Sequence, residues 1–234
     1  MRLAVIPARG GSKRIPRKNV KLFAGKPMIA WSIAAARDSG LFDHIIVSTD
    51  DADIAEIACD AGASTPFMRP LDLSDDFTPT VPVVTHALDW VETNLGPVKT
   101  VCCLYATAPF IQPDDLIRGA AILEKTGADY AFPVTSFPFP IQRAVRLTDT
   151  ARMEMLSPEF ALTRSQDLEE AYHDVGQFYW GQRNAWVDGL SIIGPNAAPV
   201  IIDRHRAQDI DTPEDWKRAE LMFHAIDKLE ASNT

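Results

Sequence analysis

Short apolar runs alternate with amphipathic stretches along most of this 234-residue chain. The apolar runs are rich in Val, Ile, Leu and Ala, as buried parallel strands are, and lie at residues 3–8, 44–50, 98–107, 129–136 and 199–203. The amphipathic stretches have helical spacing and lie at residues 26–40, 51–63, 80–94, 113–127 and 212–230. Strands that alternate with helices predict an α/β fold, with three layers around a mostly parallel sheet.

The pattern is interrupted once, between residues 137 and 182. This central region is less regular, and we interpret it as an insertion within one domain that spans residues 1–234. Phe178 and Trp180, near its end, are expected to be ordinary strand and core residues. At the last helix, Asp211 or Thr212 is expected to form the N-cap, with Pro213 in the first turn.

Composition narrows the class of protein. A net charge of -9 and a pI near 5.0 argue against a general nucleic-acid binder, which needs a basic face. Cys102 and Cys103 are adjacent in an apolar run, so we interpret them as core residues of a protein in a reducing cytoplasm. We expect neither a signal peptide nor a membrane-spanning segment, because the first apolar run is short and no run approaches eighteen apolar residues.

A basic loop follows the first predicted strand, against the acidic balance of the chain. The stretch PARGGSKRIPRKN places Gly10, Gly11 and Ser12 among five cations, which are Arg9, Lys13, Arg14, Arg17 and Lys18. Adjacent glycines let backbone N–H groups approach an anion, and clustered cations repel one another unless an anion neutralises them. A nucleoside triphosphate carries enough negative charge to neutralise these five cations, although a loop can also be basic by chance. The Walker A and G-x-G-x-x-G patterns are both absent from the sequence.

Two further stretches carry candidate chemistry. Asp209 and Asp211, two residues apart in QDIDTPEDW, point the same way in an extended segment and could hold Mg²⁺; a helix cap and a solvated acid are the alternative. The run TRSQDLEEAYHDVGQFYWG mixes amides, a guanidinium and aromatic rings, which suits a hydroxyl-rich, carboxylated ligand such as an acidic sugar. Arg143 could be a second carboxylate clamp or a strand-edge charge.

Four segments, in this order, resemble the CMP-sugar synthetases, the cytidylyltransferases for sialic acid-like nonulosonic acids and for Kdo. They are IPARGGSKRIPRKN, FMRPLDLSDDFT, CLYATAPF and QDIDTPEDW. Within the family, SFPFPIQRA and TRSQDLEEAYHDVGQFYWG most resemble the pseudaminic acid branch. The sialic acid enzymes usually have glutamine and proline where this chain has Tyr105 and Ala106, which argues against N-acetylneuraminate as the substrate.

The resemblance implies a role for individual residues. The nucleotide would be held by Arg9, Gly10, Gly11, Ser12, Lys13, Asn19, Arg69 and Thr80. The sugar would be contacted by Tyr105, Arg143, Arg164, Gln166 and Gln177, and Mg²⁺ by Asp209 and Asp211. Arg9, Lys18 and Asp211 would serve catalysis, with both cations near the reacting phosphorus.

The resemblance also implies a Rossmann-like fold with a small dimerisation insertion, a homodimer, and transfer of CMP from CTP to the sugar with release of pyrophosphate. Pseudaminic acid is the expected acceptor, and N-acetylneuraminate, Kdo or a sugar phosphate are alternatives. A nucleotide-binding module without catalysis is the competing class, although it has no need of a paired metal site. An oxidoreductase is disfavoured by the missing dinucleotide fingerprint. The sequence identifies no general base.

Overall fold

The computed structural model describes residues 1–232, and in this part of the chain a seven-stranded sheet forms the centre of the molecule. Its path runs through β11 (Ala197–Ile201), β6 (Tyr130–Ser136), β10 (Phe178–Gln182), β5 (Thr100–Leu104), β1 (Arg2–Pro7) and β4 (His44–Ser48). The strand β9 (Tyr172–Asp174) adds to β6. β10 is antiparallel to both of its neighbours and β9 to β6, and the other pairs are parallel.

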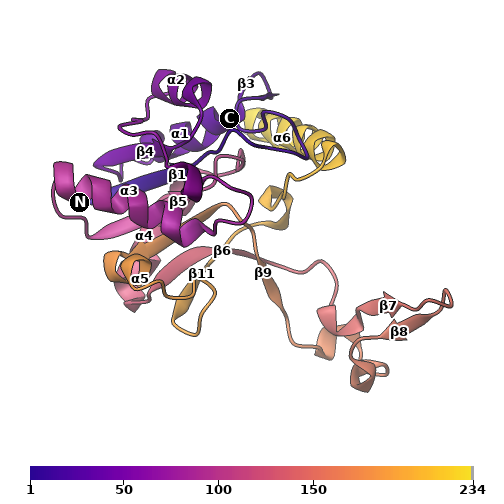
Figure 1. Cartoon of the computed structure of the whole chain (residues 1–234). Helices are drawn as coiled ribbons and strands as arrows, with labels where there is room; N and C mark the ends of the chain where they lie inside the picture. The colour runs from indigo at the N-terminus through magenta and orange to yellow at the C-terminus, as the bar shows by residue number, and fades with distance from the viewer. Residues whose placement is uncertain (233–234) are drawn as a thin grey trace.

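Helices cover both faces of this sheet (Figure 1). One face packs on α1 (Met28–Asp38), α2 (Ala52–Asp60) and α4 (Pro113–Thr126), through a core that includes Ile33, Ile54 and Leu116. The other face packs on α3 (Thr80–Asn94) and α5 (Arg183–Val187), through a second core with Leu88 and Trp186. The predicted three-layer α/β fold with a mostly parallel sheet is therefore confirmed. Cys102 and Cys103 lie in β5 and are buried, as expected.

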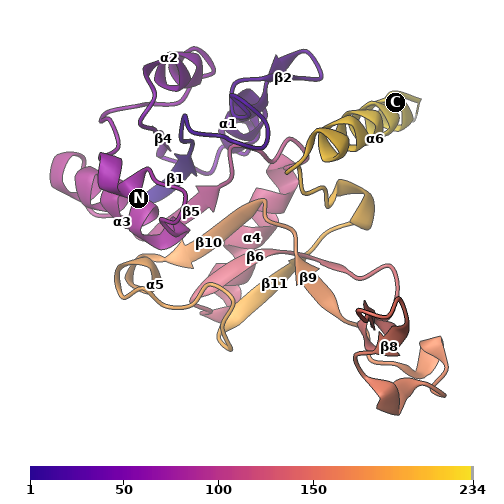
Figure 2. The same cartoon turned by 45° about the vertical axis from the view of Figure 1, so that its right-hand side comes forward.

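The last helix, α6 (Pro213–Ser232), packs beside the sheet rather than on it (Figure 2). Trp216 and Ala219 bury against Phe23 and Phe110, next to the short strands β2 (Leu22–Phe23) and β3 (Lys26–Pro27). Thr212 caps α6, because its hydroxyl accepts the N–H of Asp215 at 3.2 Å. The Asp211 carboxylate is thus available to other partners. Within residues 1–232, no helix is both long and apolar enough to cross a membrane.

Residues 137–171 leave the body of the molecule as an extended arm (Figures 1 and 2). The arm contains a small hairpin, β7 (Val145–Leu147) and β8 (Met153–Met155), and three short 3-10 helices, η2 (Ile141–Arg143), η3 (Pro158–Phe160) and η4 (Ser165–Asp167). The irregular region was predicted to span residues 137–182, but the arm ends at residue 171, so the predicted carboxyl-terminal boundary is too late. Residues 172–174 and 178–182 return to the main sheet, because Phe178, Tyr179 and Trp180 are all buried in its two cores.

Candidate active site

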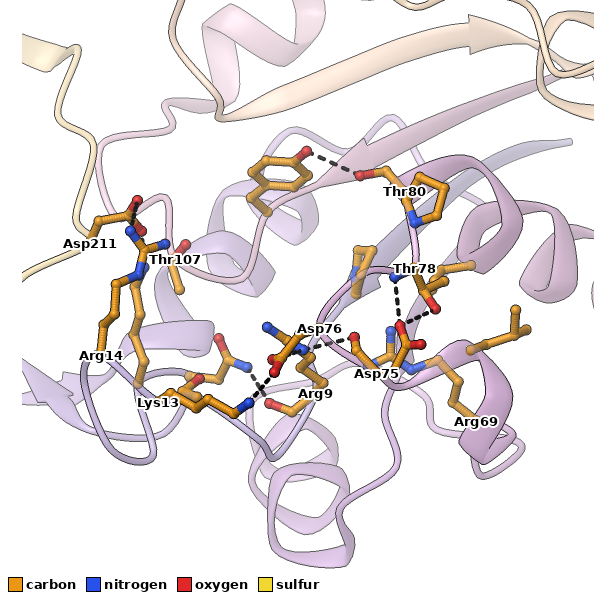
Figure 3. Close-up of a pocket in the computed structure, with 18 of the residues that line it drawn as sticks. Arg9, Lys13, Arg14, Arg69, Asp75, Asp76, Thr78, Thr80, Thr107 and Asp211 are labelled. Atoms are coloured by element: carbon orange, nitrogen blue, oxygen red, sulfur yellow. Dashed lines mark hydrogen bonds and ion pairs between the residues drawn. The ribbon is translucent and has the colours of Figure 1, made fainter.

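A cavity of about 300 Å³ opens beyond the carboxyl ends of β1 and β5, where ligands commonly bind in sheets of this kind (Figure 3). Its walls come from three parts of the chain. The loop after β1 supplies one wall, the segment from Arg69 to Val83 a second, and Tyr105 and Thr107 after β5 a third. Asp211, from the segment before α6, also reaches it.

The basic loop forms the first wall as the sequence predicts. Arg9, Ser12, Lys13, Lys18 and Asn19 line the cavity, together with Arg14. Asn19 is buried, and its side-chain amide donates to the carbonyl oxygen of Arg9 at 2.9 Å, which ties the two ends of the loop together. The loop therefore has a fixed base from which its cations extend.

Gly10 is required by close packing at the base of this loop. Its N–H donates to Asp50 Oδ1 at 3.0 Å, and a Cβ at residue 10 would lie 2.6 Å from Asp51 Oδ2. Asp51 cannot move freely, because its other oxygen accepts the N–H of Ile54 and caps α2. A Cβ at Gly11, by contrast, would meet nothing within 4 Å. The backbone role predicted for the two glycines toward a nucleotide stays a prediction.

Carboxylates from distant segments pair with the cations of the cavity. Arg9 Nη1 donates to the carbonyl oxygen of Asp75 at 2.7 Å and to Asp76 Oδ1 at 2.6 Å, and Lys13 donates to Asp76 Oδ2. The hydrogen bonds from Lys13 and Arg9 hold the pKa of Asp76 below its usual range. Sequence reasoning missed Asp75 and Asp76, although the segment DLSDDFT that carries them had been singled out.

Asp211 is the second carboxylate of the cavity lining that pairs with cations of the loop. Arg14 Nη1 lies 2.8 Å from one of its oxygens and Lys18 Nζ lies 3.3 Å from the other. In Figure 3 the Arg14 and Asp211 side chains point toward each other across one end of the cavity. Lys18 and Asp211 are thus brought together, as their shared predicted role in catalysis requires.

Arg69 is buried in the wall of the cavity with few partners of its own. Its Nε and Nη2 atoms have no hydrogen-bond partner among the described residues, and Nη2 lies 3.8 Å from Asp50. Burial lowers the pKa of the Arg69 guanidinium, an effect that Asp50 partly opposes. A buried guanidinium with free donors is costly unless a ligand supplies acceptors, so Arg69 is suited to bind one.

A second cavity, of about 480 Å³, adjoins the first. Lys18, Tyr105, Thr107 and Asp211 line both cavities. The second also contains Asp174, Tyr179 and Asp209. A ligand in one compartment can therefore meet a ligand in the other beside Lys18 and Asp211.

Two neighbouring tyrosines line the second cavity, and one of them, Tyr105, also lines the first. The hydroxyl of Tyr105 lies 3.1 Å from Thr80 Oγ1, and its ring centroid lies 5.4 Å from that of Tyr179. The Tyr179 hydroxyl donates to Asp174 Oδ2 at 2.6 Å. Burial raises the pKa of Tyr179 strongly, so this hydroxyl stays protonated at neutral pH. The run that contains Tyr179 was expected to suit an acidic sugar, whereas Asp174 was not singled out from the sequence.

The predicted metal ligands, Asp209 and Asp211, both line the second cavity. Within residues 1–232, no group of three or more His, Cys, Asp or Glu side chains could hold a metal ion. Two carboxylates still fit Mg²⁺, which commonly takes one or two protein carboxylates and completes its shell with water and substrate phosphates.

The predicted sugar residues fall into three groups. Tyr105 lines both cavities. Gln177 is buried and donates to the carbonyl oxygen of Arg206 at 2.8 Å, so it supports the segment leading to Asp209 rather than lining either cavity. Arg143, Arg164 and Gln166 belong to the arm and line neither cavity of their own chain.

Known proteins of one family are similar to this chain. A family model described as cytidylyltransferase matches residues 3–186. The chain is 41% identical over 221 residues to pseudaminic acid cytidylyltransferase of Campylobacter jejuni, covering 94% of this chain and 95% of that protein. It is 32% identical over 228 residues to the CMP-N,N'-diacetyllegionaminic acid synthase of Legionella pneumophila, covering 94% and 95%.

A solved structure has the same fold. The structure of CMP:2-keto-3-deoxy-manno-octonic acid synthetase complexed with CTP superposes with a TM-score of 0.69 at 18% identity, covering 96% of this chain and 98% of that one. The superposition includes nearly the whole chain. At this identity the similarity establishes the α/β architecture.

Proposed function

The chain belongs to the cytidylyltransferase family, and we propose that it transfers CMP from CTP to a nonulosonic acid, pseudaminic acid, with release of pyrophosphate. The observation that carries the proposal is the 41% identity to pseudaminic acid cytidylyltransferases over 94% of the chain. Two relatives named for other nonulosonic acids are less similar, at 32% and 31% identity.

The first cavity suits the nucleotide. Arg9, Lys13 and Lys18 supply positive charge for a triphosphate, and Ser12 adds a hydroxyl donor. The buried Arg69 offers donors to the ribose or base, and Thr80 lies nearby on the same wall. These contacts would hold the α-phosphorus at the boundary with the second cavity.

The second cavity suits the sugar. Its anomeric hydroxyl would attack the α-phosphorus of CTP, and the bond to the departing pyrophosphate would break. Both substrates are anions, so bringing them together requires cations in fixed positions. Lys18 lines both compartments and is the residue best placed to offset the charge that develops between them.

We include Mg²⁺ in the proposal, held by Asp209 and Asp211. When bound there, Mg²⁺ would offset charge on the phosphate oxygens. Arg14 and Lys18, which contact Asp211, would then be released to the phosphates or the sugar carboxylate.

We also propose that the enzyme acts as a cytoplasmic homodimer. The arm carries strongly exposed apolar side chains, among them Phe139, Leu147, Met153 and Leu162. Such a patch on a soluble protein marks an interaction surface. If a second copy covers it, Arg143, Arg164 and Gln166 of one arm can contribute to the sugar compartment of the partner. The free thiols of the three cysteines fit a reducing compartment.

Release of pyrophosphate tests the reaction class. CTP, Mg²⁺ and the protein are incubated with and without pseudaminic acid, and pyrophosphate is measured by a coupled phosphatase assay. We expect release only when both substrates are present. A protein that binds CTP yet releases no pyrophosphate with any nonulosonic acid or Kdo would support the non-catalytic module instead.

A further inference from the structure

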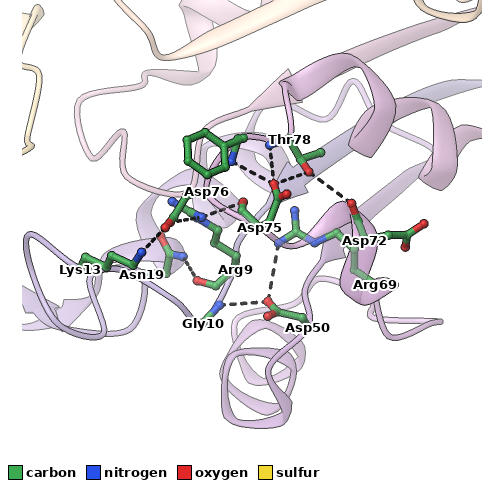
Figure 4. Close-up of polar contacts among 11 residues, drawn as sticks. Arg9, Gly10, Lys13, Asn19, Asp50, Arg69, Asp72, Asp75, Asp76 and Thr78 are labelled. Atoms are coloured by element: carbon green, nitrogen blue, oxygen red, sulfur yellow. Dashed lines mark hydrogen bonds and ion pairs between the residues drawn. The ribbon is translucent and has the colours of Figure 1, made fainter.

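One carboxylate pairs with two of the cations expected to bind the triphosphate. Asp76 accepts from Arg9 at 2.6 Å through Oδ1 and from Lys13 through Oδ2 (Figure 4). A second bond, 2.7 Å long, joins Arg9 to the carbonyl oxygen of Asp75. All four side chains line the first cavity. Asp76 therefore stands where an anionic ligand would be expected.

The contact has the form of a phosphate contact. A carboxylate that presents one oxygen to a guanidinium and the other to an ammonium resembles a phosphate that presents two of its oxygens to the same pair. Arg9 and Lys13 cannot direct the same donors to Asp76 and to a ligand. A polyphosphate that takes the donors now directed to Asp76 must therefore displace its carboxylate.

The segment that carries Asp76 keeps its shape without this contact. The Asp75 carboxylate accepts from the N–H of Phe77 at 2.9 Å, and from the N–H and hydroxyl of Thr78 at 2.6 Å and 2.7 Å. Ser74 donates to the carbonyl oxygen of Pro70 at 2.9 Å. These bonds lie within the segment, so its turn can persist while Asp76 moves.

Little burial holds the segment against the cavity. The Phe77 side chain is 90% exposed, and Leu71, in the 3-10 helix η1 (Leu71–Leu73), is 84% exposed. Few apolar contacts would be lost if residues 71–79 moved outward. Segments of this kind open at low free energy.

We propose that Asp76 is an internal phosphate mimic that closes the polyphosphate part of the cavity until a ligand displaces it. The inference rests on the proposed function, because it takes Arg9 and Lys13 as triphosphate ligands. Binding of CTP or pyrophosphate then includes breaking the two ion pairs of Asp76. CMP, which lacks the β- and γ-phosphates, leaves them intact. The carboxylate also returns to Arg9 and Lys13 when pyrophosphate leaves.

The test compares three ligands on two variants. Asp76→Asn removes the charge that pairs with Arg9 and Lys13. Asp72→Asn is the matched control, because Asp72 lies on the same segment and contacts Thr78 through its backbone carbonyl oxygen. Isothermal titration calorimetry of the whole protein gives the dissociation constants of CTP, pyrophosphate and CMP, with and without Mg²⁺.

We expect Asp76→Asn to bind CTP and pyrophosphate about threefold to tenfold more tightly than wild type, because two partly exposed ion pairs no longer compete. CMP binding should be unchanged, and Asp72→Asn should match wild type for all three ligands. Weaker CTP binding by Asp76→Asn would overturn the proposal, because Asp76 would then orient the cations for the ligand.

Two other outcomes would also overturn it. Equal tightening by Asp72→Asn would indicate a general charge effect, and equal tightening of CMP would place the effect outside the polyphosphate part of the cavity. Failure of the proposed sugar transfer can be told apart from failure of this inference, because the titrations measure ligand binding without any sugar. A wild-type protein that binds pyrophosphate but not CTP would contradict the nucleotide assignment while the pyrophosphate titration still tests Asp76.

Discussion

Asp211 is one of the residues that the two compartments share. It lines both cavities and pairs with Arg14 and Lys18, while Thr212 performs the capping of α6. The sequence left open whether Asp211 caps the last helix, and the structure shows that Thr212 does so. The Asp211 carboxylate becomes available to a metal ion when Arg14 and Lys18 bind the substrates instead.

Replacing Asp211 should therefore abolish most activity without unfolding the protein. Asp211→Asn keeps the shape of the side chain but removes the charge that attracts both Mg²⁺ and Lys18. We expect kcat to fall by about a hundredfold or more, and the Mg²⁺ dependence of CTP binding to weaken in calorimetry. Asp60→Asn, on the exposed end of α2, is the control. Wild-type turnover by a folded Asp211→Asn variant would refute the metal role.

We expect the burial of Arg69 to serve ligand binding rather than folding. Arg69→Met removes a buried guanidinium that has few partners in the free protein, so the melting temperature of the ligand-free protein should stay the same or rise. The increase in melting temperature that CTP produces in wild type should be largely lost. Thermal unfolding with and without CTP measures both quantities. A lower melting temperature with a normal CTP response would show that Arg69 is structural.

The loop cations and the paired acids found from the sequence share a local signal, whereas the contact made by Asp76 depends on distant residues. The cations of the basic loop are adjacent in sequence, and Asp209 and Asp211 are two residues apart. Asp76 meets Lys13 across 63 residues. Tyr179 was part of a run that also reads as ordinary strand. Only the folded chain brings such residues to the same cavity.

At the scale of elements, the helices and parallel strands follow from pattern and capping. α4 begins at Pro113 and ends before Gly127, whose φ of 66° suits glycine, and the sequence gives both signals. β10 could not be placed in the same way, because it is antiparallel and returns from the arm. Its neighbours, β5 and β6, are distant in sequence. The direction of such a strand depends on tertiary contacts rather than on its own residues.

The basic loop and α2 are joined at Gly10, and this junction can be tested. Gly10→Ala would place its Cβ 2.6 Å from Asp51 Oδ2, while Asp51 caps α2 and pairs with Arg17. We expect a loss of about 1–3 kcal/mol in the free energy of unfolding. Gly11→Ala, whose Cβ meets nothing, should leave it nearly unchanged. Denaturant unfolding compares the two, and equal losses would contradict the packing argument.

At the scale of the whole molecule, the body holds both cavities while the arm carries three predicted sugar residues (Figure 2). The interruption of the strand–helix pattern predicted where the arm lies in the sequence. It did not predict that the arm extends away from the body. Within one chain Arg143, Arg164 and Gln166 have no access to the site. The proposed dimer is what would give them a role.

Mixing two inactive variants tests whether each active site combines the body of one chain with the arm of another. Asp211→Asn impairs the cavities in the body of its own chain. Arg164→Ala impairs only the arm, which would act in the partner's site. If each site combines one body with the partner's arm, a mixed dimer has one intact site. After subunit exchange, activity should recover to about a quarter of wild type, because half of the dimers are mixed. No recovery despite exchange, shown by mass-tagged subunits, would contradict a shared site.

The most direct test of the central claim is a one-pot competition. Equimolar pseudaminic acid, N-acetylneuraminic acid and Kdo are incubated with CTP, Mg²⁺ and the protein, and the CMP-sugars are quantified by mass spectrometry at early times. The account predicts that CMP–pseudaminic acid predominates and that pyrophosphate equals total CMP-sugar. Predominance of CMP–N-acetylneuraminic acid or CMP-Kdo would contradict it and assign Tyr105, Tyr179 and Asp174 to a different sugar.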